Sequence, residues 1–117
     1  MAFPGTYNFN YYRGDTYQFI IYPKDSDGNT FPLDDFSSAV FTIANKRGGG
    51  TGVQQYSATA EINTVTDAVT CTITPTQGRN LTAGTSYVYD IQITDGINIY
   101  TLLTGTITTT DDITGAI

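Results

Sequence analysis

The residues in this sequence that are best suited to chemistry form one short polar run, Asp25-Ser26-Asp27-Gly28-Asn29. Alternating oxygen-bearing side chains are typical of calcium-binding loops, and Asp25, Asp27 and Asn29 are the candidate ligands. The spacing argues against such a site, because a calcium-binding EF-hand has glycine at its sixth position and glutamate at its twelfth, where this chain has Phe36. The Asp-Gly pair favours a hairpin turn, with a weak calcium site as the alternative.

The sequence offers few groups for catalysis. Histidine, the usual general base near neutral pH, is absent from the chain. The single cysteine, Cys71, alternates with Val69 and Ile73, which predicts a small buried core residue rather than a reactive thiol. Adjacent carboxylates such as Asp34 and Asp35 are expected to be solvated rather than to form a glycosidase pair. We therefore predict no enzymatic activity, no cofactor and no transition-metal site.

The composition predicts one acidic domain. A chain of 117 residues is the size of a single domain. Its net charge of −6 disfavours binding to nucleic acids and to anionic membranes. No apolar run approaches the ~20 residues that a membrane-spanning helix needs. The first residues lack the basic and apolar regions of a secretory signal, so we expect the protein to remain in the compartment where it is made.

The pattern of apolar residues predicts an all-β fold. Seven runs rich in aromatic and β-branched residues are separated by turn signals, and no segment has convincing helical periodicity. This spacing is typical of a sandwich of about seven antiparallel strands. The predicted strands cover residues 7–12, 16–23, 40–45, 53–62, 68–74, 87–94 and 97–107.

The entry into the strand at residues 87–94 carries the most specific pattern. Leu81, Gly84 and Tyr87 resemble the Leu-x-Pro-Gly-x-x-Tyr entry of fibronectin type III and immunoglobulin-like domains, with Ala83 in place of proline. In this tyrosine corner, leucine closes the end of the core, glycine makes the turn, and the tyrosine hydroxyl reaches an upstream backbone group. The alternative is an ordinary hairpin strand with a half-buried tyrosine.

Aromatic residues are more numerous than a small core requires. The chain has nine Tyr and six Phe residues, and tyrosine suits interfaces because it offers a large surface with a polar tip. The alternative is that several of these rings are half-buried cross-strand partners. Together with the tail, the residues that we expect at an interaction surface are Tyr7, Phe9, Tyr11, Tyr12, Tyr22, Thr108, Ile113 and Ile117.

Five further motifs follow one another along the chain: Arg13-Gly14-Asp15-Thr16, Asp27-Gly28 before Pro32-Leu33, Ile73-x-Pro75, Leu81-x-x-Gly84-x-x-Tyr87-x-Tyr89-Asp90-Ile91, and Thr101-Leu102-Leu103-x-Gly105-x-Ile107. Their order resembles the immunoglobulin-like modules of small bacteriophage virion proteins, such as head-decoration and tail or baseplate proteins.

This resemblance implies an N-terminal arm with the first strand at residues 1–12, a sandwich at 13–107 and a C-terminal extension at 108–117. It also implies a non-enzymatic protein that is made in the host cytoplasm and assembled into the virion. Such a protein would dock on other virion proteins, or on a second copy of itself, through strand edges, tyrosine-rich faces and terminal arms. The alternative is a module that recognises a host surface or a carbohydrate through exposed tyrosines.

Overall fold

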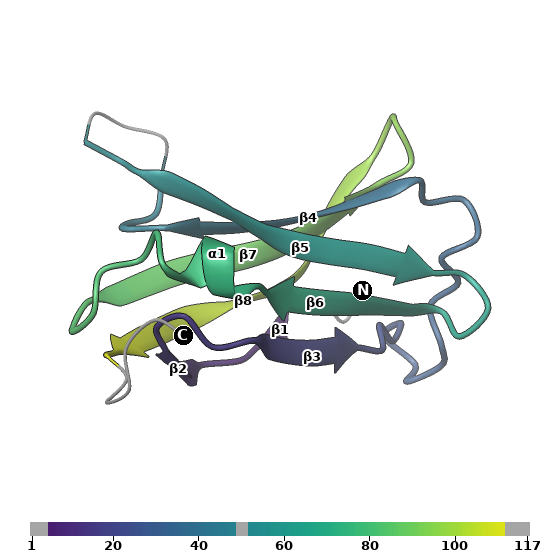
Figure 1. Ribbon diagram of the computed structural model, residues 1–117. Helices are drawn as coiled ribbons and strands as arrows, with labels where there is room; N and C mark the ends of the chain where they lie inside the picture. The colour runs from purple at the N-terminus through teal and green to yellow at the C-terminus, as the bar shows by residue number, and fades with distance from the viewer. Residues whose placement is uncertain (1–4, 49–51, 112–117) are drawn as a thin grey trace.

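The computed structural model describes residues 5–48 and 52–111, and in these residues the protein is all-β with almost no helix (Figure 1). Each of the seven predicted runs contains a strand, and the short strand β1 at the N-terminal side was not predicted. The elements are β1 (Gly5–Thr6), β2 (Phe9–Tyr12), β3 (Tyr17–Ile21), β4 (Ser38–Ala44), β5 (Gln55–Asn63), β6 (Ala68–Ile73), α1 (Pro75–Gly78), β7 (Ser86–Thr94) and β8 (Ile99–Thr110).

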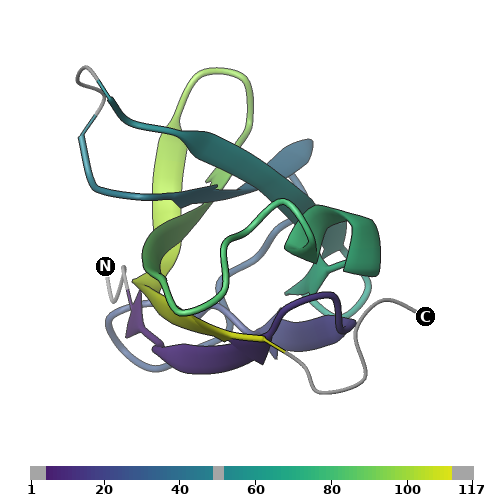
Figure 2. The ribbon, with the colours of Figure 1, turned by 60° about the vertical axis from the view of Figure 1, so that its left-hand side comes forward.

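The strands form one curled sheet in the order β1-β8-β7-β4-β5-β6-β3, and β2 also pairs with β8. The curl depends on β5, which pairs with β4 through residues 55–58 and with β6 through residues 59–63. Figure 2 shows that the sheet wraps around the core, so that β3 comes back toward β1 and β2. The two ends of the strand order therefore face each other across a gap, which we call the seam.

The expectation that all strands are antiparallel is wrong at one place, because β1 and β2 run parallel to β8. The expected boundary at residue 107 also divides a strand, since β8 continues to Thr110 and pairs there with Tyr12. The physical reason is burial: Tyr11 and Thr109 are register partners, and both are buried. Residues 5–12 and 108–110 thus belong to the sheet, while 1–4 and 112–117 lie outside the described residues.

The core is filled by the inward side chains of both halves of the sheet. Strand β7 shows the predicted alternation, with Tyr87, Tyr89, Ile91 and Ile93 buried. At the seam the core consists of aromatic rings, and the centroids of Phe9 and Tyr17 are 4.4 Å apart. The other fully or nearly fully buried apolar residues are Leu33, Phe41, Ile43, Ala68, Val69, Cys71, Ile73, Leu81, Leu102 and Ile107.

The tyrosine corner has the expected local contacts. Gly84 has a φ angle of +75°, which favours glycine, and Leu81 is buried. The hydroxyl of Tyr87 accepts a hydrogen bond of 2.7 Å from the backbone N–H of Thr82. The corner therefore fixes the loop before β7 against the start of that strand.

We predict that Tyr87→Phe lowers the free energy of unfolding by about 1–2 kcal/mol, because the N–H of Thr82 loses its partner in a partly buried site. Urea denaturation followed by circular dichroism measures this change. The matched control is Tyr56→Phe, whose hydroxyl bonds to the exposed side chain of Gln54 and whose ring packs against Tyr87. Equal losses in the two variants would contradict a specific role for the corner.

The parallel pairing of the N-terminal segment depends on Gly105 in β8. A Cβ atom at this position would lie 1.9 Å from the carbonyl oxygen of Tyr7. The same stretch is fixed by hydrogen bonds from the N–H of Tyr7 to Thr104 O and from the N–H of Thr106 to Asn8 Oδ1, each 3.0 Å long. Only glycine lets the two backbones approach this closely.

We predict that Gly105→Ala destabilises the protein by about 3 kcal/mol, because the methyl group must push the backbone at Tyr7 away from β8. Thermal and urea unfolding measure the loss. Gly28→Ala is the control, since Gly28 has a φ angle of +84° but no atom within 4 Å of an added Cβ. If Gly105→Ala lowers the free energy of unfolding no more than Gly28→Ala does, the close approach of the two backbones does not contribute to stability.

Candidate interaction surface

The outer edge of β3 is open. On its other side β3 pairs with β6 over its whole length. Among the described residues no backbone hydrogen bond reaches the outer edge of residues 17–21. Its inward residues Tyr17, Phe19 and Ile21 are only half-buried, and Ile20 on the outward face is 47% exposed. This edge carries backbone donors and acceptors beside exposed apolar surface.

Beside this edge lies an apolar groove along the seam. One cavity of about 260 Å³ is lined by Phe19, Ile20 and Ile21 of β3 on one side and by Tyr7 and Leu103 on the other. A second cavity of about 220 Å³ shares Ile21 and Leu103 with the first, so the two form one groove. The further lining residues of the second cavity are Gly5, Tyr22, Pro23, Lys24 and Leu102.

The floor of the groove is made by a β-bulge in β8. Opposite β7, Ile91 pairs with Leu103 but Gln92 pairs with Thr101, so Leu102 is an extra residue on the β8 side. The inward alternation is thereby broken, and both Leu102 and Leu103 line the seam. Gly5 on the neighbouring strand β1, the register partner of Leu103, has no side chain to cover the two leucines. A Cβ atom at Gly5 would lie 3.4 Å from Leu103 Cδ1.

Aromatic rings close one end of the seam. The ring of Tyr7 packs against Phe19 with a centroid distance of 5.4 Å, and the hydroxyls of Tyr7 and Tyr17 are hydrogen-bonded to each other. The hydroxyl of Tyr89 donates to the carbonyl oxygen of Tyr7. Burial, followed by the hydrogen bond from Tyr7, raises the pKa of Tyr17 to about 12, and burial also raises the pKa of Tyr89.

The structure divides the expected interaction residues into groups. Tyr7 and Tyr22, which are 39% and 57% exposed, lie at the seam, whereas Tyr12 is exposed at the end of β2. Phe9 and Tyr11 are buried in the core, so the expectation that they contact a partner is corrected. Their alternation faces inward because β2 pairs with β8, which the sequence pattern did not indicate.

The tail residues also divide. Thr108 lies in β8, where it is exposed and pairs with Asn10 and Ser86, so it is part of the sheet. Ile113 and Ile117 lie outside the described residues. Sequence reasoning did not select Ile20 or the leucine pair of the bulge. The signal for Ile20 was available, because both faces of the run at residues 16–23 are apolar.

The acidic loop after β3 is a hairpin turn. Asp25 Oδ1 accepts hydrogen bonds of 2.9 Å from the N–H groups of both Asp27 and Asn29, and Gly28 has a φ angle of +84°. The Asp25 carboxylate thereby closes the turn on its own backbone. Within residues 5–48 and 52–111, no group of three or more His, Cys, Asp or Glu side chains could hold a metal ion.

Cys71 is fully buried on β6, and burial raises the pKa of its thiol to about 12. Burial and the raised pKa both favour the protonated thiol at neutral pH, which is the less nucleophilic form. This position agrees with its alternation with Val69 and Ile73, which are also buried.

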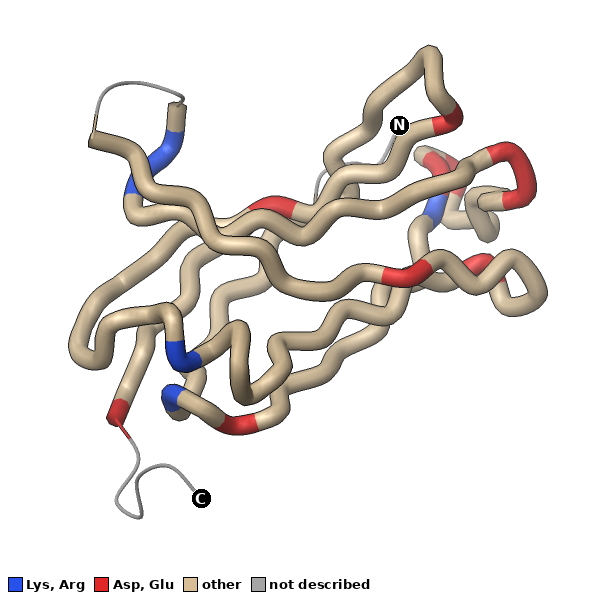
Figure 3. The backbone as a smooth tube through the Cα atoms, turned by 45° about the horizontal axis from the view of Figure 1, so that its top comes forward, with Lys and Arg blue, Asp and Glu red and all other residues tan. Residues whose placement is uncertain are grey.

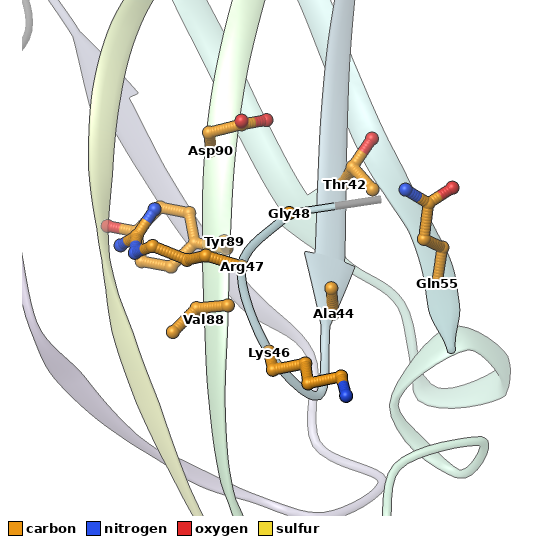
Figure 4. A pocket seen from close by; sticks show the side chains of 9 residues that line it. All are labelled: Thr42, Ala44, Lys46, Arg47, Gly48, Gln55, Val88, Tyr89 and Asp90. Atoms are coloured by element: carbon orange, nitrogen blue, oxygen red, sulfur yellow. The ribbon is translucent and has the colours of Figure 1, made fainter. Parts of the chain in front are cut away.

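A polar cavity of about 220 Å³ lies over β4 and β7, away from the seam, and Figure 4 shows its lining. Its lining includes two of the five basic residues of the chain, Lys46 and Arg47, and the carboxylate of Asp90. Partial burial raises the pKa of Asp90, and Arg47 opposes this shift. The head groups of Lys46 and Arg47 point away from each other in Figure 4, and Arg47 donates to Gly105 O at 3.3 Å. The two cations do not converge on one ligand.

No protein-family model matches the chain, and no curated protein is significantly similar to it. Among the helices in the described part of the chain, none is long and apolar enough to cross a membrane. The seam therefore stands as the candidate site on its own geometry.

We predict that the protein loses stability as pH rises from about 10 toward 12. The folded state binds the phenolic protons of Tyr17 and Tyr89 more tightly than the unfolded state, so stabilisation is complete below pH 10 and declines above it. Ultraviolet absorbance of tyrosinate and thermal unfolding over this range measure both effects. The decline should be smaller in Tyr17→Phe, and titration of all tyrosines in one step near pH 10 would contradict the prediction.

Proposed function

We propose that this chain is a non-catalytic structural protein of a bacteriophage virion, a head-decoration or tail component, which docks on neighbouring subunits through the seam. The observation that carries the docking is the apolar groove beside the unpaired edge of β3. The assignment to a virion rests on the resemblance of the motif order across residues 13–107. No cofactor, nucleic acid or membrane takes part in this proposal.

The strand order supports an immunoglobulin-like domain of unusual form. In that fold strands B, E and D are neighbours in one sheet, and C, F and G in the other. With β1 and β2 together as strand A, the order β3-β6-β5 corresponds to B-E-D, and β4-β7-β8 corresponds to C-F-G. The tyrosine corner at Tyr87 then stands at the start of strand F, its usual place.

Two departures from that fold concern the seam. Strand β5 joins the two sheets by pairing with both β4 and β6. Strand A pairs with G rather than with B, because β1 and β2 lie on β8. In the immunoglobulin fold the edge of B is covered by A, so here the edge of β3 is left without its usual neighbour. A partner strand would complete this sheet.

The composition of β3 favours coverage by a partner. Natural proteins protect open strand edges with charges, prolines or bulges, because unpaired backbone groups recruit other strands. From residue 16 to residue 22 this edge has no charge and no proline. Charged residues lie mainly in the loops and at the ends of the strands (Figure 3). Addition of a strand from a neighbour gains main-chain hydrogen bonds, and the groove accepts apolar side chains.

We predict that Ile20→Lys lowers the occupancy of the protein in virions about tenfold or more, because it places a charge beside the docking edge. Mass spectrometry of virions produced with the variant gene measures the copy number. The matched control is Val40→Lys on β4, since Val40 is 53% exposed on an outward face away from the groove.

Equal occupancy of the two lysine variants and the wild type would overturn docking through the seam. Both variants must first show the circular dichroism spectrum and melting temperature of the folded domain. The alternative, a recognition module, would be favoured if the isolated domain binds a glycan array and substitution of Tyr12 or Tyr22 abolishes that binding. The same substitutions would then leave the occupancy of the protein in virions unchanged.

A further inference from the structure

We infer that the opening between β4 and β5 binds a basic side chain, a lysine or an arginine, on the surface of a partner protein. This opening is distinct from the seam. In the strand order the two are separated by β5, β6 and β3 on one path and by β4, β7 and β8 on the other. The protein thereby has a second docking surface, independent of the one in the proposed function.

The opening exists because β5 leaves β4 to join the other half of the sheet. Strand β4 pairs with β7 from Ser38 onward, but it pairs with β5 only from Phe41 onward. Beyond Ala58, β5 pairs with β6 instead, and Figure 1 shows β4 and β5 diverging. Within the described residues no backbone hydrogen bond joins residues 38–40 to residues 59–63. Two unpaired strand edges, with their N–H and C=O groups, therefore border the opening.

The cavity in this opening has a volume of about 550 Å³ and combines apolar walls with one carboxylate. The apolar lining residues are all half-buried: Phe36, Ala39, Ala60 and Ile62. The lining residues with hydroxyl groups are exposed: Ser37, Ser38 and Thr64. Glu61 completes the lining and is exposed as well. Within the described residues no hydrogen bond or ion pair holds its carboxylate, so it is available to a partner.

This lining suits a long organic cation rather than a metal ion. Lysine and arginine have an apolar stem and a charged head, so the stem can lie on Ala39 and Ile62 while the head bonds to Glu61. A calcium ion usually takes about six to eight oxygen ligands, whereas the cavity offers one carboxylate. The chemistry of the cavity therefore selects a basic side chain.

The distribution of charge in the molecule favours a basic partner at this end. Three loops lie there, at residues 22–37, 64–67 and 95–98, and acidic positions gather on them (Figure 3). Together with Glu61, these loops hold seven of the eleven acidic residues of the chain and one of the five basic residues. They therefore carry the whole net charge of −6. Such a field attracts a positively charged surface and accelerates its association.

Exposed aliphatic side chains favour a protein as the partner. Val65 in the loop after β5 and Ile97 in the loop after β7 flank the opening and are 91% and 90% exposed. Asn63 Oδ1 accepts a hydrogen bond of 3.0 Å from the N–H of Val65. Asp95 Oδ1 accepts one of 2.9 Å from the N–H of Ile97. Both tips are thus held in place, and since turns favour Gly, Asn, Asp and Ser, turn formation does not account for the aliphatic residues.

Titration with a lysine peptide tests the cavity. The probe is a capped hexapeptide of alternating lysine and glycine at pH 6, and the backbone amide signals in nuclear magnetic resonance spectra locate its binding. Signals of residues 36–39 and 60–64 should shift. A matched peptide with diaminobutyric acid keeps the charge but shortens each stem by two methylene groups. It should bind about fivefold more weakly, because less of the stem contacts the apolar walls. Equal affinity of the two peptides would overturn the cavity as the binding site.

A matched pair of variants separates the cavity from the general field of the acidic end. Glu61→Gln should weaken binding of the lysine peptide about fivefold, because the ion pair is lost. Asp27→Asn removes the same charge from the same end, but Asp27 does not line the cavity. Its dissociation constant should change less than about twofold. Equal losses in the two variants would contradict the site, and both residues are exposed, so both variants should fold.

Spermidine tests whether the partner is a protein. It carries the same charge as the peptide but has no backbone to pair with the strand edges, so it should bind more weakly. Spermidine binding as tight as that of the peptide would overturn a protein partner. The seam variant Ile20→Lys should bind the peptide as the wild type does, since Ile20 lines the groove of the seam. A wild type that does not bind the lysine peptide would overturn this inference and leave docking through the seam intact.

Discussion

The two ends of the curled sheet are held together by aromatic rings rather than by backbone hydrogen bonds. Phe9 lies between Tyr17 and Tyr89, with centroids 4.4 and 5.5 Å from its own, and Tyr7 packs on Phe19. Such pairs add to the hydrophobic effect without satisfying any main-chain group. The seam is therefore closed in the core and open at the backbone, and docking through the seam depends on this difference.

The N-terminal segment decides which edge stays open. It could extend the β3 side of the sheet, as strand A does in immunoglobulin domains, or pair with β8. The close approach of Tyr7 to Gly105, together with the bonds of Asn8 and Tyr89, fixes it on β8. Because the N-terminal segment pairs with β8, it cannot also pair with β3, and the outer edge of β3 stays unpaired. An uncharged free edge in an otherwise acidic protein is more consistent with an interface than with a surface exposed to solvent.

Local patterns in the sequence predicted the strands and the corner well. Alternation located β7, and the spacing of Leu81, Gly84 and Tyr87 predicted contacts that the structure contains. Pairing could not be predicted, because a strand has the same alternation whether its neighbour is parallel or antiparallel. The surplus of rings is compatible with an interface or with half-buried cross-strand partners, and the expectation of an interface is wrong for Phe9 and Tyr11, which fill the core beside β8. The end of β8 was missed because its inward residue there is Thr109, which is not apolar. The bulge at Leu102 has no signal in the alternation of a run that is apolar on both faces.

The parallel ladder joins residues that are far apart in the sequence, since Phe9 pairs with Ile107. During synthesis on the ribosome β1 and β2 must wait until β8 has emerged, because it is the last of the described strands and their only partner among them. Contacts so distant in sequence form slowly, because the loop between them must close first. For that interval the N-terminal strands of the nascent chain lack their partner and can pair with β8 of another copy, so exchange of this segment between chains is the misfolding route that the topology favours.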